Sequence, residues 1–216
     1  MTTSKRALDV CGSTLGLVLL GPLFLMIALA IVMEDGGPVL FRQQRVGRGG
    51  RLFRLWKFRT MHVGAEYAGG QLTVGRDPRI TRVGHWLRRA KLDELPQLLN
   101  VLRGEMSLVG PRPEVPRYVA LYTPEQRAVL NEIPGITDPA SLRYYDESIE
   151  LARAADPERM YVEQIMPEKI RLNLEYAVRA TPATDLVVVL STLRRLIARS
   201  SRDERPGSLI GSTLRP

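Results

Sequence analysis

Residues 10–33 read VCGSTLGLVLLGPLFLMIALAIVM, a stretch of twenty-four positions without a charged side chain. As a straight helix rising 1.5 Å per residue, it would be about 36 Å long, which exceeds a bilayer hydrocarbon core of roughly 30 Å. Pro22 stands in the middle, and a proline inside a helix removes one backbone donor and crowds the preceding turn. We therefore expect a membrane helix that bends sharply at Gly21 and Pro22.

The charges on both sides of this stretch bear on its topology. Lys5 and Arg6 precede it, and a basic run follows it with no carboxylate in residues 37–64. Because Lys and Arg near a membrane segment are retained on the cytoplasmic side, a straight span would place one basic group on the wrong side. We therefore favour a re-entrant helix over residues 1–35. A Pro-kinked span and a signal peptide are the alternatives, and the GxxxG step over residues 12–16 is typical of a helix-packing face.

The composition restricts the chemistry. The chain has 31 Lys and Arg against 23 Asp and Glu, a net charge of +8 that suits anionic partners. Cys11 is the single cysteine and there are two histidines, which excludes a disulfide framework and makes a zinc site improbable. Chemistry must then rest on carboxylates, basic groups and a hard cation. Residues 36–199 suffice for one compact domain, and we expect residues 200–216 to be a disordered tail.

Local patterns predict the elements of that domain. Residues 39–46 and 51–58 form a hairpin around a glycine-rich turn. Helices are predicted over residues 81–91 and 183–199. A third is predicted to begin at an Asp93 cap and to end near residue 102, where Gly104 closes it. Two more are predicted to begin at Thr123 and at Asp156. The helix over residues 183–199 carries an apolar face that suits either a headgroup region or packing on the protein surface. The predicted fold class is α+β, mostly helical, with one hairpin and with surface and interfacial amphipathic helices around a compact cytoplasmic domain.

Adjacent carboxylates at Asp93 and Glu94 are the strongest candidate for chemistry. Both carboxylates would be explained if Asp93 capped a helix and Glu94 lay in its first turn. There the helix macrodipole stabilises a negative charge by about 0.3–1 kcal/mol. Two carboxylates about 5 Å apart, however, repel by roughly 3 kcal/mol at an effective dielectric of 20. A buried pair therefore requires a cation, either from Arg88, Arg89 and Lys91 or as Mg²⁺.

Five sequence motifs occur together in one order. They are KFRTM at residues 57–61, DPRITRVG at 77–84, LDELPQL at 92–98 with NVL at 100–102, GEMSLVGPRP at 104–113, and PGIT at 134–137. In this respect the chain resembles the small monotopic polyprenyl-phosphate phosphoglycosyl transferases, a family of bacterial sugar transferases, over most of residues 5–137. The resemblance implies a monotopic enzyme at the cytoplasmic face of the bacterial inner membrane, held by a re-entrant helix. It implies transfer of a phosphosugar from a UDP-sugar to a polyprenyl phosphate, such as undecaprenyl phosphate, with release of UMP. This reaction is the first membrane step of polysaccharide or glycoconjugate assembly.

The resemblance also implies roles for the acidic pair. Asp93 corresponds to the family's nucleophile, which forms a covalent aspartyl-phosphosugar intermediate, and it is the expected Mg²⁺ ligand. Such an intermediate is a mixed anhydride that retains transfer potential, whereas a serine phosphoester would be a trap. Glu94 would assist either the metal site or the attack of the lipid phosphate.

Basic residues near the motifs are the expected substrate-binding groups. Arg88 would hold phosphate oxygens, and its alternative role is an exposed helix charge. Arg112, between Pro111 and Pro113, would line the nucleotide end of the site, unless it pairs with Glu105 or Glu114 to fix a loop. Lys57 and Arg59 would reach a diphosphate or a lipid headgroup, unless they form a solvated strand face.

Two departures from the family limit what the sequence implies. Gly21-Pro22 replaces the more usual Ser-Pro, so the angle of the bend in the membrane helix is left open. Residues 138–142 lack the aromatic-containing pattern common in the family, so the transferred sugar is left unassigned. The expected partners are a UDP-sugar, a polyprenyl phosphate and cytoplasmic-leaflet lipids, without nucleic acid, and a homodimer is one option. The competing hypotheses are a non-catalytic, membrane-tethered basic module that binds nucleic acid or anionic lipid, and the same transfer without a covalent intermediate.

Overall fold

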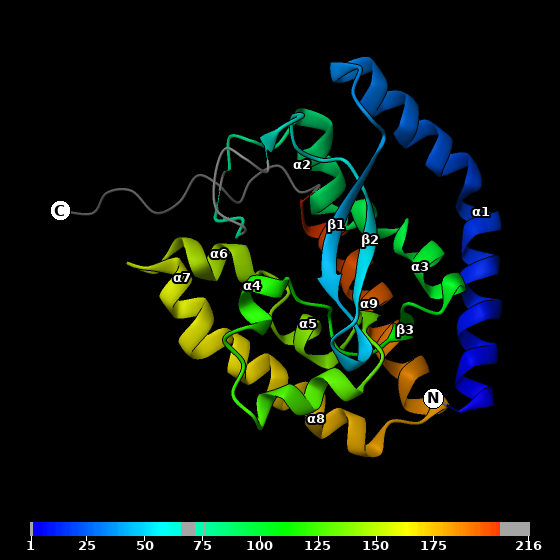
Figure 1. Ribbon diagram of the computed structural model, residues 1–216. Coiled ribbons are helices and arrows are strands. Elements are labelled where there is room, and N and C mark those ends of the chain that lie inside the picture. Colours follow the sequence, from blue (N-terminus) through cyan, green and yellow to red (C-terminus); the bar gives the residue numbers. More distant parts are fainter. Residues whose placement is uncertain (1, 66–71, 76, 204–216) are drawn as a thin grey trace.

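The computed structural model describes residues 2–65, 72–75 and 77–203 and is mostly helical (Figure 1). In chain order its elements are α1 (Thr3–Asp35), β1 (Leu40–Val46), η1 (Arg48–Gly50), β2 (Leu52–Phe58), α2 (Arg82–Arg89), η3 (Leu92–Glu94), α3 (Gln97–Arg103), β3 (Ser107–Val109), α4 (Pro116–Val119), η4 (Gln126–Asn131), β4 (Gly135–Thr137), α5 (Pro139–Arg143), α6 (Glu147–Ala152), α7 (Pro157–Met160), the π-helical η5 (Tyr161–Ile165), α8 (Met166–Arg179) and α9 (Pro182–Asp203). Helix α9 includes the first residues of the predicted tail; the remainder of that tail, 204–216, lies outside the described residues.

The apolar stretch forms α1, which is long and apolar enough to cross a membrane. Thr2 caps its start and Gly36, with φ of 65°, ends it. In Figure 1 its two halves run in different directions. Apart from its own stretch of the helix, no described atom lies within 4 Å of where a Cβ at Gly21 would stand. The side chains exposed along its outer side are Leu15, Val18, Leu19, Leu25, Met26, Leu29 and Met33. This side of α1 therefore faces solvent or lipid.

The inner side of the first half of α1 packs on α3 and β3. A Cβ at Gly12 would lie 2.9 Å from Leu108, and one at Gly16 would lie 3.1 Å from Leu98. The predicted GxxxG packing face is therefore confirmed, and its partner is the chain's own domain.

Polar contacts fix the N-terminal end of α1 to the domain. Lys5 forms an ion pair with buried Asp185 at the start of α9, and Asp185 also accepts a hydrogen bond from Tyr176. Arg6 donates to the carbonyls of residues 101 and 102 at the end of α3, at 2.6 and 2.8 Å. Asp9 accepts hydrogen bonds from the Ser107 hydroxyl and the Leu108 amide.

The C-terminal end of α1 binds the same domain. Glu34 accepts hydrogen bonds from the first amides of α2, and Asp35 forms an ion pair with Arg59, which follows β2. Ile27 and Ile31 pack with Phe58 and Leu87 in one hydrophobic cluster. Both ends of α1 are thus attached to one body.

Strands β1 and β2 form the predicted antiparallel hairpin, with Leu40 opposite Phe58 and Val46 opposite Leu52. The hairpin lies between α1 with α3 on one side and the group from α4 to α8 on the other (Figure 1). A second cluster joins Leu55 of the hairpin to α3 and β3. The largest cluster, centred on Tyr118, Tyr161 and Ile165, holds α4, η4, η5 and α8 together.

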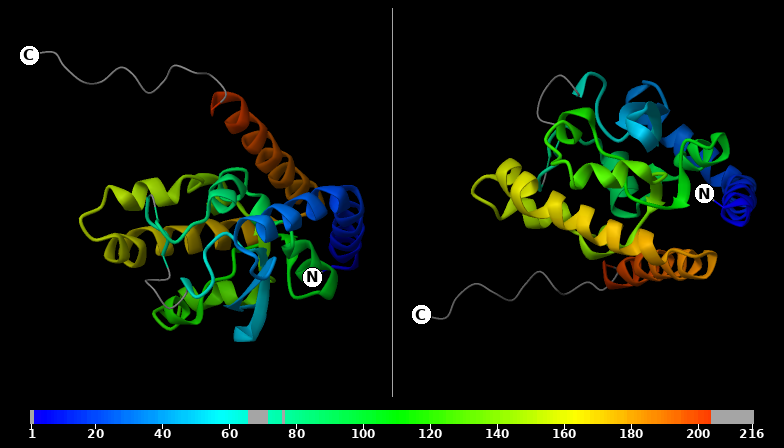
Figure 2. Two further views of the ribbon diagram at one scale, coloured as in Figure 1. Left: turned by 90° about the horizontal axis from the view of Figure 1, so that it is seen from above. Right: turned by 60° about the horizontal axis from the view of Figure 1, so that its bottom comes forward.

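The helix starts test the local predictions. Thr123 and Gln126 bond reciprocally and Asp156 caps α7, as predicted. The helix predicted over residues 81–91 forms as α2, and Thr81 caps it, a role that was not predicted. The predicted Asp93 cap is wrong, because its carboxylate makes no capping hydrogen bond and Lys91 instead precedes η3. Helix α9 forms as predicted, and Figure 2 shows its C-terminal part extending beyond the neighbouring helices.

Candidate active site

A cavity of about 1230 Å³ opens beside the hairpin. Its walls come from β1, β2, α2, η3, the segment before α4, and the segment from α5 to α6, with part of α9. The lining includes Lys57, Arg59, Arg88, Asp93, Glu94 and Arg112. The structure therefore brings every charged residue predicted for the site to one cavity, and the contacts of each residue separate their roles.

Asp93 is buried at the cavity wall, with 6% of the residue exposed. Within the described part of the chain, no hydrogen bond or ion pair is formed by its carboxylate. Lys91 turns the chain between α2 and η3, just before Asp93. It is the one described non-glycine residue with a positive φ, which is 54°. Burial raises the pKa of Asp93, and the neighbouring charge of Glu94 raises it further, although Lys57 opposes the change. The result is an acid that has no partner among the described residues and faces a space large enough for a ligand.

Glu94 has the opposite surroundings. Lys57 Nζ lies 3.0 Å from its Oε1, and the Arg112 guanidinium binds both oxygens, with Nη1 2.8 Å from Oε2. Burial raises the pKa of Glu94, but Arg112 and Lys57 outweigh burial and hold that pKa well below its usual value. Glu94 is therefore held ionised by two cations, which it organises around itself.

Arg112 is fixed by the backbone on both sides of it. The Pro111 carbonyl accepts a hydrogen bond from Gly135 N at 3.0 Å, and the Pro113 carbonyl accepts one from Arg45 at 3.0 Å. A Cβ at Gly135 would lie 2.1 Å from Gly110 N, so the close approach of β3 and β4 requires glycine there. Pro111 and Pro113 thus present Arg112 from a rigid loop.

The alternative partners considered for Arg112 are engaged elsewhere. Glu114 forms an ion pair with Arg45 and accepts a hydrogen bond from Tyr161, and Glu105 accepts one from Asn100. Arg45, Tyr161 and Asn100 were not among the predicted site residues. Arg45 lies in the basic run and Glu114 directly follows the Pro-Arg-Pro motif, but neither position indicates the pairing without the fold.

Arg88 points from the last turn of α2 into the cavity, where it is half-buried. Its Nε donates to Thr60 Oγ1 at 2.8 Å and its Nη1 to Thr73 Oγ1 at 3.1 Å. In the described ranges, no carboxylate forms an ion pair with it. Burial lowers the pKa of Arg88, and Asp93 offsets part of that effect. A partly buried guanidinium with hydroxyl partners is suited to binding an anion, because its charge is not yet compensated.

Arg59 lies at the cavity edge, but its guanidinium binds the end of α1. It forms two hydrogen bonds to the Asp35 carboxylate, and Nε donates to the Pro38 carbonyl at 2.6 Å. Lys57, two residues earlier, points to Glu94 instead. The two strand cations expected to act together therefore have different partners.

The basic run does not form one continuous exposed face. Arg45, Lys57 and Arg59 turn inward and form ion pairs with carboxylates, while Arg42 stacks on the Trp56 ring at 4.7 Å. This arrangement fits a charged cavity better than the extended surface that nucleic-acid binding requires.

The acidic residues can be tested for a metal site. The described residues contain no group of three or more His, Cys, Asp or Glu side chains that could hold a metal ion. Mg²⁺ is commonly held by one or two carboxylates together with substrate phosphates and water. Asp93, without a protein partner at the cavity wall, fits an ion that is shared with a diphosphate.

Comparisons with known proteins identify the family of the chain. A family model described as bacterial sugar transferase matches residues 1–199. The chain is 40% identical over 196 residues to the UDP-glucose:undecaprenyl-phosphate glucose-1-phosphate transferase of Caulobacter vibrioides, covering 89% of this chain and 69% of the relative. It is 46% identical over 121 residues to the UDP-N-acetylgalactosamine-undecaprenyl-phosphate N-acetylgalactosaminephosphotransferase of Aeromonas hydrophila, covering 56% and 29%. It is 50% identical over 109 residues to the UDP-glucose:undecaprenyl-phosphate glucose-1-phosphate transferase of Escherichia coli, covering 50% and 24%. The three names share undecaprenyl phosphate; two of them name glucose as the sugar and one names N-acetylgalactosamine.

Proposed function

Because the chain belongs to the bacterial sugar transferase family, we propose that it transfers a phosphosugar from a UDP-sugar to undecaprenyl phosphate and releases UMP. The observation that carries the proposal is the contrast between the neighbouring carboxylates, with Asp93 free at the cavity wall and Glu94 bound by two cations. Of these two neighbouring carboxylates, Asp93 is the one without a described partner and is available to react.

In the first half-reaction, an Asp93 carboxylate oxygen attacks the phosphorus that carries the sugar. The new bond is an acyl phosphate, and the bond that breaks is the one linking this phosphorus to the bridging oxygen of UMP. Arg88 holds phosphate oxygens as their charge increases, and Arg112 with Lys57 stabilises the departing phosphate. Water is largely excluded from the buried carboxylate, which favours attack over solvation.

In the second half-reaction, a phosphate oxygen of undecaprenyl phosphate attacks the same phosphorus and Asp93 leaves. The acyl-phosphate bond breaks, the carboxylate is restored, and no net proton is transferred when both phosphomonoesters are dianions. Glu94 acts as a positioning residue that keeps Lys57 and Arg112 in place. When bound, Mg²⁺ would be held by Asp93 together with the diphosphate and would reduce the repulsion that an approaching carboxylate meets.

The attachment of α1 supports a monotopic, re-entrant arrangement at the cytoplasmic face of the inner membrane. A straight crossing would carry Lys5 and Glu34 to opposite surfaces, yet both bind the same domain. The apolar side chains exposed on α9 provide a second lipid contact; they are Leu186, Val187, Leu190, Leu193 and Ile197. Trp86 on α2, 55% exposed, provides a third.

The experiment is to trap the intermediate. Purified protein is mixed with Mg²⁺ and, one at a time, with a panel of UDP-sugars that are labelled in the sugar-linked phosphate; no lipid acceptor is added. The protein is then analysed for bound label, and the solution is analysed for UMP. We expect one label per chain, equimolar UMP, and discharge on addition of undecaprenyl phosphate. Asp93→Asn should abolish labelling, whereas the matched change Asp185→Asn, at a buried carboxylate that pairs with Lys5 at the start of α1, should retain it. Labelling of the Asp93 variant would refute the assignment of the nucleophile.

A further inference from the structure

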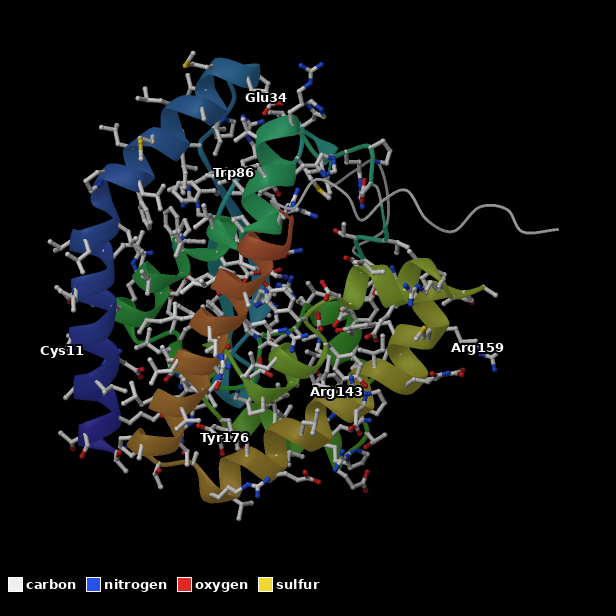
Figure 3. The ribbon with its side chains drawn as sticks, turned by 180° about the vertical axis from the view of Figure 1, so that it is seen from behind. Cys11, Glu34, Trp86, Arg143, Arg159 and Tyr176 are labelled. Carbon is white, nitrogen blue, oxygen red and sulfur yellow. The ribbon has the colours of Figure 1, made fainter. Side chains whose placement is uncertain are left out.

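Helix α1 ends in two adjacent acids that bind different elements. Glu34 accepts hydrogen bonds from Arg82 N at 2.7 Å and Val83 N at 3.0 Å. Figure 3 shows Glu34 at the end of α1, beside the helix that carries Trp86. Asp35, the next residue, binds the Arg59 guanidinium instead. The same end of the membrane helix therefore contacts α2 and the segment that follows β2.

The first of these contacts leads to Arg88 through α2. Glu34 binds the first turn of this helix, and Arg88 projects from the last turn. The helix sits directly on the segment after β2, because a Cβ at Gly84 would lie 2.0 Å from the Thr60 carbonyl oxygen. Thr81 N donates to that same oxygen at 3.1 Å. A displacement of the first turn would consequently be transmitted along a rigid, closely packed helix.

The second contact leads to Arg88 through the chain. Arg59 is 6% exposed and uses its guanidinium on Asp35 and on the Pro38 carbonyl, while its backbone N–H donates to the Val39 carbonyl. The next residue, Thr60, accepts the hydrogen bond from Arg88 Nε at 2.8 Å. The bond between Arg59 and Asp35 is thus one of the contacts that hold the segment carrying the Thr60 hydroxyl, which helps to orient Arg88.

We propose that Glu34 and Asp35 are positioning residues that set the place of Arg88 in the cavity from the end of the membrane helix. The two contacts converge on one guanidinium, one through α2 and the other through Arg59 and Thr60. The inference rests on the proposed role of Arg88 in holding substrate phosphate. It gives the acidic end of α1 a part in catalysis as well as in attachment.

A double-mutant cycle separates this role from a merely structural one. The kcat/KM for UMP release is measured in membranes with Mg²⁺, undecaprenyl phosphate and the UDP-sugar that reacts fastest in the panel above. The measured proteins are the wild type, Asp35→Asn, Arg88→Lys and the double variant. We expect Asp35→Asn to lower kcat/KM about tenfold in the wild type, because small misplacements of positioned groups cost such factors. In the Arg88→Lys background, Asp35→Asn should change kcat/KM by no more than about twofold, because Arg88, the residue through which Asp35 acts, is already replaced.

The matched control is Asp185→Asn, which removes the carboxylate paired with Lys5 at the other end of α1. Its effect should be the same in both backgrounds, since the described contacts of Asp185 do not lead to Arg88. If Asp35→Asn fails to give folded protein, Glu34→Gln tests the branch through α2 with the same comparison. An equal loss from Asp35→Asn in both backgrounds would overturn the inference. An unchanged kcat/KM in Arg88→Lys alone would instead overturn the proposed role of Arg88.

Discussion

Removing the charge from Asp93 and from Glu94 should change the stability of the protein in opposite directions. The two substitutions, Asp93→Asn and Glu94→Gln, are nearly isosteric and alter adjacent residues. Glu94 is bound by Lys57 and Arg112, whereas no described side chain binds the Asp93 carboxylate. We expect Glu94→Gln to lower the melting temperature and Asp93→Asn to raise it.

The loss at Glu94 follows from its ion pairs. At the 3.0 Å that separates Lys57 Nζ from Glu94 Oε1, two unit charges interact by about 5.5 kcal/mol at an effective dielectric of 20. Desolvation cancels part of that energy, but removing one partner leaves buried cations uncompensated, which costs about 3–5 kcal/mol. For a chain of this size, the decrease in melting temperature is roughly 6–20 °C.

The gain at Asp93 is smaller and depends on pH. Because burial raises its pKa above 3.8, the ionised carboxylate destabilises the folded state at pH values above the folded-state pKa. Asp93→Asn should then raise stability by about 1 kcal/mol, or about 2–4 °C, at neutral pH. The gain should decrease as the pH falls through the raised folded-state pKa and disappear below 3.8, where the carboxyl is protonated in both states. The loss in Glu94→Gln should instead persist until the pH falls through the low folded-state pKa of Glu94.

The assay is thermal unfolding of the three proteins in one detergent, followed by the fluorescence of Trp56 and Trp86 from pH 4 to pH 8. Labelling by the UDP-sugar is measured in parallel, because Asp93→Asn should be more stable and yet inactive. If Asp93→Asn lowers the melting temperature as much as Glu94→Gln does, the reasoning is refuted. Such a loss would mean that the Asp93 carboxylate forms a stabilising contact in the folded protein.

Further predictions concern topology and packing. In a Cys11→Ser background, single cysteines at Ser4 and Val63 should react with an impermeant thiol reagent from the same side of sealed membrane vesicles; reaction from opposite sides would establish a straight span. Gly84→Ala should destabilise the protein by more than about 2 kcal/mol, because its Cβ would overlap a backbone carbonyl of the segment after β2. Gly21→Ala, whose Cβ meets no described atom within 4 Å, should change the melting temperature by less than about 2 °C.

The sequence predicted the elements whose signals are local. The hairpin, the Asp156 cap and the GxxxG face depend on residues close in sequence, and the structure has all three. The Asp93 cap failed because the carboxylate faces a cavity, and the turn before it is made by Lys91 in a left-handed conformation that lysine seldom adopts.

The site could be located from its motifs, but its pairings could not. Lys57 and Arg59 have the same charge and neighbouring positions, and nothing local indicates that one binds Glu94 and the other Asp35. The partner of Arg112 was equally open, because Glu94, Glu105 and Glu114 are all carboxylates within reach of a flexible chain. Such choices depend on which surfaces the tertiary fold brings together, and that information is distributed over the whole chain.

The ion pair between Lys5 and Asp185 also has a consequence for biogenesis. The two residues are 180 positions apart, so at about 5–20 residues per second the ribosome adds Asp185 roughly 10–40 s after Lys5. For most of that interval the apolar helix, which ends at Asp35, is already synthesised, while the carboxylate that will pair with Lys5 does not yet exist. Early capture of the helix by lipid or by a targeting factor would shield it during translation, and closure of the N-terminal end onto α9 must come among the last steps of folding.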